Sequence, residues 1–485
     1  MKNIINGLLK RILGLGSLGL VCKTLLFSST IVIAAPQGGT VVQGQGTIVQ
    51  PTANVTTINQ NTQNLAIDWN SFNLSSNESV TFNQPNASSV ALNRILSASP
   101  SEIMGRINAN GHVILSNQNG ILFGANAQVN VGGLLATGLD IDPAQFMSGK
   151  FKLGNNGDAG FVINHGLLSA AVGGSINLVG GTVKNDGVII ADLGQINLLA
   201  GESAIVDFSG DGLLNFQITN SVKQNLSGTD SAAENNGVLQ ADGGKVVIEA
   251  SVAQDIFSQA VNNTGIIRAS KIERVGGVVR LSGSGGHVRN SGEINAVNGG
   301  EVVLDSSDQT EMSGSARIDV SNNNGVGGTV NLLGNKVGLF DNSAIDATGK
   351  TGGGSVKIGG DIQGGGTLKT ADYTIMSNAA SIDASATENG NGGTVVLWAD
   401  KVSQIHGDIK ARGGDQSGNG GFVETSGKEF LDVTSIPDAG AAVGDSGVWL
   451  LDPTNISIEE RPATDLTQDE GSNVVTGPIG AATNP

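Results

Sequence analysis

The chain has 485 residues, with 73 glycines, only 4% aromatic residues and a formal net charge of −17. Its charged fraction of 14% lies well below the ~25% of an ordinary soluble domain. Hydrophobic residues still make up 39%, which is too many for a disordered chain of so little charge. The acidic balance argues against nucleic acid or anionic lipid as the main partner, because both need basic patches. A core with so few aromatic side chains must use small and branched aliphatic residues in thin layers, which favours stacked β-coils.

The first 34 residues are typical of a secretory leader. An apolar run at 25–33 follows a basic region and ends at the small residue Ala34. The basic residues are Lys2, Lys10, Arg11 and Lys23. A membrane anchor is the alternative, but the apolar run is too short to cross ~30 Å of hydrocarbon. We therefore predict a signal peptide at 1–34, export through the Sec route and the periplasm, and no stable membrane insertion. The single cysteine, Cys22, lies in this leader, so the mature chain forms no internal disulfide.

Residues 36–145 are rich in asparagine and contain several specific runs. These are Ile-Asp-Trp-Asn-Ser-Phe-Asn at 67–73, Val-Thr-Phe-Asn-Gln-Pro at 80–85, Ser-Ser-Val-Ala-Leu-Asn-Arg at 88–94, Ile-Asn-Ala-Asn-Gly-His-Val at 107–113, Asn-Gln-Asn-Gly-Ile-Leu-Phe-Gly at 117–124 and Val-Gly-Gly-Leu-Leu-Ala-Thr at 131–137. Together they resemble the haemagglutination-activity (secretion) domain of filamentous haemagglutinin-like exoproteins, the two-partner secretion family, and in particular its high-molecular-weight adhesin branch. The run Gly-Val-Trp-Leu-Leu-Asp-Pro at 447–453 is similar to a phrase that such exoproteins carry late in the filament.

The resemblance implies a domain organisation, a partner and a location. It implies a two-partner secretion domain core at 35–165, followed by β-helix repeats at 166–452 and a linker or disordered tail at 453–485. It also implies that an outer-membrane β-barrel transporter with periplasmic binding modules recognises the N-terminal region. The chain would cross that membrane unfolded, and its folding outside would favour outward movement. The expected location is therefore the bacterial cell surface or the medium.

The family's Asn-Pro-Asn-Gly-Ile motif falls on Asn117, Gln118, Asn119, Gly120 and Ile121, with Gln118 in place of the proline. Asn119-Gly120 is a turn signal, and the Asn117 side chain can cap that turn. Proline would pre-set φ at the first central position of the turn, so its loss costs about 0.4–1 kcal/mol of pre-organisation. Two interpretations stay open: the transporter recognises these residues directly, or they only shape a corner of a coil.

A two-part unit repeats from about residue 170. Its first part is Gly-Gly followed by an alternating strand, and the strand positions that we expect to face inward hold Val, Ile or Leu. These inward pairs are Ile176/Leu178, Val246/Ile248, Val279/Leu281, Val302/Leu304, Val330/Leu332, Val356/Ile358 and Val395/Leu397. The outward position between them varies: Asn177, Val247, Arg280, Val303, Asn331, Lys357 and Val396. A constant inside and a variable outside indicate a core stripe.

The second part of the unit is a shorter strand that ends in a small residue. Examples are Leu239/Ala241, Ile267/Ala269, Ile294/Ala296, Ile345/Ala347, Ile382/Ala384 and Ile409/Ala411. One such coil cannot bury its apolar face alone, so successive coils must stack. We predict an all-β, right-handed parallel β-helix with the secretion domain as its N-terminal cap, rather than a β-sandwich. At roughly 22 residues per coil, ~4.8 Å apart, this gives about 19 coils.

An enzyme is the rival functional class, because some parallel β-helices cleave acidic polysaccharides. That chemistry needs carboxylates and a basic residue that converge in one groove. The candidates are Asp305, Asp308 and Glu311, with Arg280 and Arg317 within about a coil. We interpret them as solvated turn charges.

Other chemistry finds little support in the sequence. The four histidines, His112, His165, His287 and His406, stand singly and not at metal-ligand spacing. Glycine-rich runs continue into strands instead of opening helices, which argues against a phosphate-binding loop. The tryptophans Trp69, Trp398 and Trp449 are expected in the core or at a cap instead of as carbohydrate platforms. We therefore assign no catalytic, metal or cofactor site.

The sequence thus favours a secreted adhesin or haemagglutinin that works by binding and is not an enzyme. The sequence holds no recognisable signature that would identify a receptor on a host cell or surface. The stalk of a contact-dependent inhibition toxin is the first alternative, and a polysaccharide lyase is the second.

Overall fold

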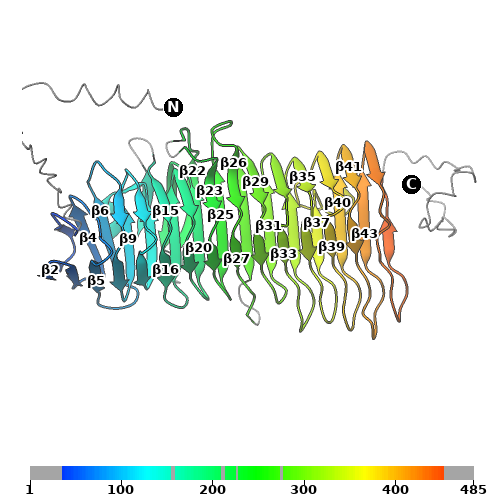
Figure 1. The fold of residues 1–485 in the computed structure, drawn as a ribbon, viewed down its shortest axis with the longest axis horizontal. Helices are drawn as coiled ribbons and strands as arrows, with labels where there is room; N and C mark the ends of the chain where they lie inside the picture. Colours follow the sequence, from blue (N-terminus) through cyan, green and yellow to red (C-terminus); the bar gives the residue numbers. More distant parts are fainter. Residues whose placement is uncertain (1–34, 155–158, 209–213, 226–227, 273–276, 453–485) are drawn as a thin grey trace, which may run out of the picture. The chain divides into compact units, whose positions relative to one another are not determined.

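The computed structural model describes residues 35–154, 159–208, 214–225, 228–272 and 277–452. The predicted signal peptide at 1–34 and the predicted tail at 453–485 lie outside these residues. Within the described part the chain winds into a stack of coils, and strands from successive coils lie side by side (Figure 1). No helix in that part is long and apolar enough to cross a membrane.

Most coils in the described part of the chain contribute one strand to each of three long sheets. Sheet 1 has 15 strands: β1 (Thr40–Gln43), β4 (Asn64–Trp69), β6 (Val90–Ile95), β9 (His112–Ser116), β12 (Gly133–Thr137), β17 (Ser175–Gly180), β20 (Gln195–Ala200), β25 (Lys245–Ser251), β28 (Val278–Ser284), β31 (Glu301–Ser306), β34 (Thr329–Leu333), β37 (Ser355–Ile358), β40 (Thr394–Ala399), β43 (Phe422–Gly427) and β45 (Val448–Leu450). Sheet 2 has 14 strands: β2 (Gly46–Thr52), β3 (Val55–Gln60), β5 (Ser79–Asn83), β8 (Arg106–Ala109), β11 (Gln128–Val131), β16 (Leu167–Ala170), β19 (Val188–Ile190), β24 (Val238–Gln240), β27 (Ile266–Arg268), β30 (Glu293–Asn295), β33 (Arg317–Asp319), β36 (Ala344–Asp346), β39 (Ser381–Asp383) and β42 (Asp408–Lys410). Sheet 3 has 12 strands: β7 (Ser101–Ile103), β10 (Ile121–Phe123), β15 (Phe161–Asn164), β18 (Thr182–Asn185), β23 (Ser231–Asn235), β26 (Gln259–Asn263), β29 (His287–Asn290), β32 (Gln309–Met312), β35 (Lys336–Leu339), β38 (Tyr373–Met376), β41 (Val402–Ile405) and β44 (Phe430–Val433).

The strands of these sheets pair in parallel except at the N-terminal end, where β1 pairs antiparallel with β4 and β2 antiparallel with β3. The predicted parallel β-helix is therefore confirmed, and two antiparallel strands close its N-terminal end. The repeat unit differs from the prediction, because most coils have a third strand, in sheet 3, that the two-part pattern missed. The coil number was also too high: sheet 1 holds 15 strands including the antiparallel β1, which leaves 14 coils. Two long coils, from β12 to β17 and from β20 to β25, account for part of the difference.

The core is the predicted aliphatic stripe. Every predicted inward pair of sheet 1 is fully buried, and Val246, Val279, Val302 and Val330 follow one another in exact register from β25 to β34. The predicted Ile/Leu and Ala pairs of sheet 2 are buried as well. Because each apolar residue stacks on a similar one in the next coil, every coil completes the burial of the coil before it.

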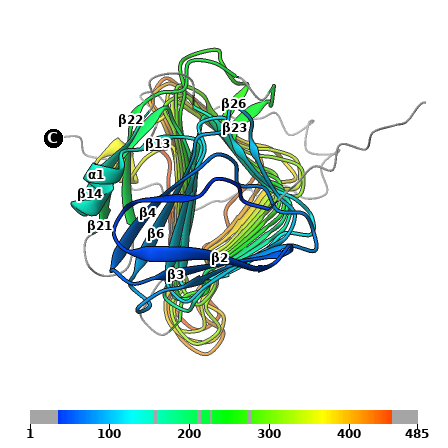
Figure 2. The same cartoon turned by 90° about the vertical axis from the view of Figure 1, so that its left-hand side faces the viewer.

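The outer face of sheet 1 differs from the prediction. Residues at the predicted outward positions, including Val247, Val303 and Val396, do lie on this face but are buried, which the pattern did not indicate. Over the N-terminal half, a four-stranded antiparallel sheet and a short helix cover this face (Figure 2). These elements are β13 (Asp140–Ile141), α1 (Pro143–Met147), β14 (Lys150–Gly154), β21 (Ser203–Phe208) and β22 (Leu214–Asn220).

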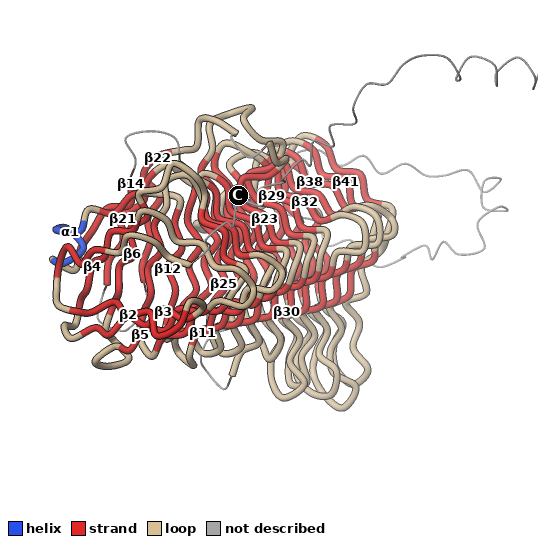
Figure 3. Tube along the Cα trace, turned by 60° about the vertical axis from the view of Figure 1, so that its left-hand side comes forward, coloured by secondary structure: helices blue, strands red, loops and turns tan. Residues whose placement is uncertain are grey.

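The cover forms a second apolar cluster with the strands beneath it. Leu92, Ile114 and Leu135 of sheet 1 pack in this cluster with Phe146 of α1 and Val206 of β21. Farther along the stack the covering element is different. A loop with the 3₁₀ turn η1 (Ile362–Gly364) lies there, and long glycine-rich loops project from the C-terminal coils on another side (Figure 3).

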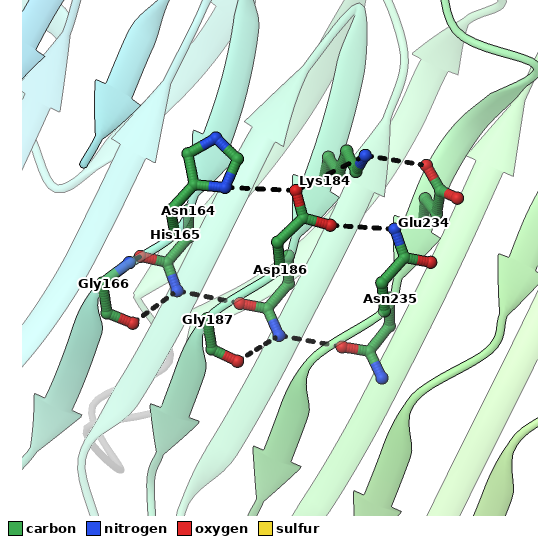
Figure 4. A network of polar contacts seen from close by, with 10 residues as sticks. Asn164, His165, Gly166, Lys184, Asp186, Gly187, Glu234 and Asn235 are labelled. Atoms are coloured by element: carbon green, nitrogen blue, oxygen red, sulfur yellow. Dashed lines mark hydrogen bonds and ion pairs between the residues drawn. The ribbon is translucent and has the colours of Figure 1, made fainter. Parts of the chain in front are cut away.

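A ladder of asparagine side chains runs through the interior where sheet 3 ends. Four successive side-chain amides each donate to the side-chain oxygen Oδ1 of the asparagine in the next coil, at 2.7–2.8 Å. The members are Asn164, Asn185, Asn235, Asn263 and Asn290, all fully buried. Figure 4 shows the ladder between Asn164 and Asn235. Each asparagine also donates to the carbonyl oxygen of the glycine two residues later. The ladder therefore satisfies polar groups at five successive corners that have no access to water.

We expect Asn263→Leu to lower the free energy of unfolding by about 1–3 kcal/mol, because it leaves the amide of Asn235 and the carbonyl oxygen of Asn290 without their buried partners. Urea unfolding followed by circular dichroism would measure this. The control is Met312→Leu, at the position of the next coil that is in register with Asn290; there the loss should stay small. Equal losses in the two variants would show that the ladder contributes only volume.

Candidate functional site

The candidate secretion residues form the corner between β9 in sheet 1 and β10 in sheet 3. The backbone N–H of Gly120 donates to the carbonyl oxygen of Asn117 at 2.9 Å, which closes a tight turn. The Asn117 side chain is fully buried and accepts from the N–H of Asn119 at 2.9 Å. It also donates to the Ser99 carbonyl oxygen at 3.1 Å and to the Ser101 hydroxyl at 3.0 Å. Asn117 therefore caps its own turn and ties it to the previous coil.

The rest of the turn is fixed by steric constraints. Gly120 has a φ of +110°, which a residue with a side chain rarely adopts. Gly160 of the next coil packs on the turn so closely that a Cβ there would lie 2.5 Å from the carbonyl oxygen of Gln118. Ile121 opens β10 and is buried in the core. Three of the five residues, Asn117, Gly120 and Ile121, are thus structural.

Gln118 and Asn119 are the two residues of the corner that are exposed. The Asn119 amide donates to the carbonyl oxygen of Ser97 at 2.8 Å, an exposed hydrogen bond to the previous coil. In the folded protein a partner can therefore reach two side-chain amides at this corner. The side chains of Asn117 and Ile121 are accessible only before this part of the chain folds.

The sequence pattern did not single out the residues that accept hydrogen bonds from Asn117 and Asn119. Ser97, Ser99 and Ser101 form an alternating run one coil earlier, and each supplies an acceptor to the asparagines. The signal was the small hydroxyl residue at every second position, which suits close contact with a neighbouring turn.

A charged pair lies on the outer face of sheet 1, close in sequence to this run. Arg94 of β6 binds Asp68 of β4 through two hydrogen bonds, of 2.9 and 2.7 Å. The hydrogen bond to Asp68 raises the pKa of Arg94 above its usual range, and the negative charges of Asp140 and Asp142 add to this effect. The group stays charged and links neighbouring coils to the start of the cover.

The residues considered for a lyase are distributed over all three sheets. Asp305 of β31 lies in sheet 1 one strand from Arg280 of β28, Glu311 of β32 in sheet 3, and Arg317 of β33 in sheet 2. Asp308 lies between sheets 1 and 3. Their closeness in sequence therefore does not bring the five together in one groove.

Most of these groups have ionic or hydrogen-bonding partners in neighbouring coils. Asp308 contacts His287 at 2.9 Å, Glu311 contacts Arg289 at 3.3 Å, and Arg317 bridges two aspartates at 2.9 and 3.1 Å. Burial raises the pKa of Asp305. Apart from Asp308, which lies between two strands, these residues belong to strands and not to turns. The ion pairs of Asp308, Glu311 and Arg317 link one coil to the next.

The histidines lie apart from one another, and two of the three tryptophans are buried. Each histidine stands in a different coil, and three of them face an aspartate of the next coil. Within the described residues, no group of three or more His, Cys, Asp or Glu side chains is arranged to hold a metal ion. Trp69 and Trp398 are buried and Trp449 is half-buried, as expected for core or cap residues.

A parallel β-helix with an antiparallel N-terminal end, a covering sheet and an asparagine-capped corner defines a β-helical domain that is closed at its N-terminal end. The family model of the TPS secretion domain matches residues 33–296. The chain therefore belongs to the two-partner secretion exoproteins, as the resemblance of its N-terminal runs implied. Proteins with this domain reach the cell surface or the extracellular space.

Individual relatives agree with this assignment. The crystal structure of the HMW1 secretion domain from Haemophilus influenzae superposes with a TM-score of 0.61 and 30% identity, over 86% of this chain and 100% of that one. A heme/hemopexin-binding protein of Haemophilus influenzae is 31% identical over 268 residues, and a second protein of that name is 28% identical over 287 residues. The matches cover 53% and 57% of this chain but only 28% and 30% of those proteins.

We expect Asn117→Ala to lower the free energy of unfolding by about 1–3 kcal/mol, because it removes three hydrogen bonds of a buried amide. Asn119→Ala removes one exposed side-chain bond, so its loss should stay below about 1 kcal/mol. Urea unfolding of the two purified variants would compare them. A larger loss for Asn119→Ala would contradict the division of the corner into buried and exposed residues.

Proposed function

We propose that residues 35–165 are the secretion core of this exoprotein, read by an outer-membrane β-barrel transporter that has periplasmic binding modules. The observation that carries the proposal is the division of the β9–β10 corner into buried and exposed residues. Gln118 and Asn119 are exposed, so a partner can reach their side chains. Amide side chains supply both donors and acceptors, which suits recognition by hydrogen bonding. Residues 166–452 then form the body that is exported.

Folding of the chain outside the outer membrane would favour its outward movement. Each coil buries the apolar face of the previous one, so the first coils act as a template on which later coils add. The antiparallel strands β1 and β2 belong to the first coils and close that end of the stack. A chain that emerges with its N-terminal region first could therefore fold coil by coil, and each added coil would oppose backward movement.

The exported body, as we propose it, acts in attachment and not in catalysis. The candidate acid and base groups are divided among three sheets, and the stack presents long flanks on which many weak contacts can add. The heme/hemopexin-binding relatives are matched over less than a third of their length, so their ligand gives little guidance for this chain. The stalk of a contact-dependent inhibition toxin is the alternative.

Export is tested with Asn119→Ala, which we expect to accumulate in the periplasm while the medium is depleted of it. Immunoblots of the two fractions from cells that carry the transporter would measure this. The matched control is Ser417→Ala, which removes one exposed hydrogen bond to the previous coil at a corner outside the residues that the family model matches, and which should be exported normally. Normal export of Asn119→Ala would leave the corner with a structural role only.

Attachment is tested with the purified mature protein, which should coat epithelial or abiotic surfaces saturably and leave polygalacturonate intact. Bound protein would be measured by immunoassay and polymer cleavage by the absorbance of unsaturated products. Release of such products, abolished by Asp305→Ala or Arg280→Ala, would favour the lyase instead. Neither attachment nor cleavage would favour the stalk.

A further inference from the structure

One segment of the C-terminal half contacts coils far from its own. Residues 359–371, here called the clasp, leave sheet 1 after β37, pass through η1 and rejoin the stack before β38. Ordinary coils hydrogen-bond to the coil before and the coil after. The clasp has side-chain contacts to residues 61–63 positions away in both directions along the chain.

The forward contact of the clasp is with β43, two strands beyond β37 in sheet 1. The backbone N–H of Gln363 donates to both carboxylate oxygens of Glu424, at 3.1 and 3.0 Å. Glu424 is fully buried although it lies on the outer face of the sheet, and burial raises the pKa of its carboxyl. A buried carboxyl group without a hydrogen-bond donor is energetically costly. Opening the clasp would remove the donor that Gln363 supplies to Glu424, so this contact holds the loop in place.

The backward contact is with the end of β31, two strands before β37. The Lys369 ammonium donates to the carbonyl oxygens of Ser306 at 2.9 Å and Ser307 at 3.3 Å. Close to the start of the clasp, Lys357 of β37 binds Asp361 at 2.7 Å, and Asp361 accepts from the N–H of Ile362. The clasp is thus attached to its own coil and to coils on both sides.

The clasp also buries apolar surface. Val396 and Trp398 point outward from β40, yet both are buried. Gly364 lies against the Trp398 ring, where a Cβ would be 2.5 Å from two ring atoms, and its φ is +63°. Gly360 lies over the same ring. The close contact of glycine backbone with the indole face explains how a short loop covers so large a side chain.

We propose that the clasp is a conformational lock that closes when the coil of β43 has formed, and that it joins β31, β34, β37, β40 and β43 into one cooperative unit. A solenoid held by nearest-neighbour contacts alone can unwind one coil at a time from its end. With the clasp closed, the coil of β43 cannot separate without also releasing the loop that holds Ser306. The lock does not depend on the proposed attachment or on the identity of the transporter.

The lock is tested by hydrogen exchange with mass spectrometry on the full chain carrying Glu424→Ala. We expect exchange to become about tenfold faster or more in the clasp and also at 301–307, four strands away from the substitution. The matched control is Arg412→Ala, which breaks the ion pair with Asp438 of the next coil only. In this control faster exchange should remain near residues 412 and 438. Glu424→Gln keeps an acceptor oxygen for Gln363 and should restore most of the protection at 301–307.

A second variant approaches the lock from its other end. Lys369→Met keeps the alkyl chain but removes the donor to Ser306 and Ser307. Hydrogen exchange should then become faster in the clasp and also in β43, although no residue of β43 is substituted. The proposal is overturned if the effect of Glu424→Ala stays within the coils adjacent to β43, or if Lys369→Met leaves β43 unaffected. If Glu424→Ala does not fold, Lys369→Met alone decides between the two outcomes.

Discussion

Backbone hydrogen bonding between coils in exact register is the constraint on which the rest of this structure depends. Once β25, β28 and β31 pair residue by residue, each side chain must stack on the side chain at the same position one coil away. The inside of the stack then has to repeat the same chemistry: aliphatic residues on aliphatic residues, and asparagine on asparagine at the corners. The ladder from Asn164 to Asn290 satisfies this requirement for polar groups, because an asparagine carries both the donor and the acceptor that a like neighbour needs.

The same constraint explains why so much of the fold could be predicted. Register requires alternation, so the Val and Leu positions of strands such as β34 identified the inward face, and all the predicted pairs proved buried. What the pattern could not show was a second burial on the outer face. Val247, Val303 and Val396 were apolar at outward positions, which was the available signal for a cover. Over β40, the segment that forms the cover is held by contacts between residues 61–63 positions apart, and no local pattern encodes them.

For the candidate site, the sequence likewise predicted the local turn but not its contacts with the previous coil. Asn119-Gly120 indicated a turn and Asn117 its cap, and both features are present. The burial of Asn117 against Ser99 and Ser101 was not visible, since it requires knowing which earlier run lies one coil below. For the same reason the acidic residues near position 305 looked like a cluster in sequence. A coil sends neighbours in the chain to different sheets, whereas it places residues one coil apart in contact.

A corner that is divided between buried and exposed residues has a consequence for export. In the unfolded chain all five residues from Asn117 to Ile121 are accessible, but folding removes the side chains of Asn117 and Ile121 from any partner. A transporter that contacts these two residues binds only the unfolded form and is released as the first coils assemble, because binding and folding then compete for the same atoms. A transporter that contacts only Gln118 and Asn119 gains no such release. Recognition through Gln118 and Asn119, as proposed above, would therefore persist in the folded corner, whereas recognition through Asn117 and Ile121 would end as the early coils form.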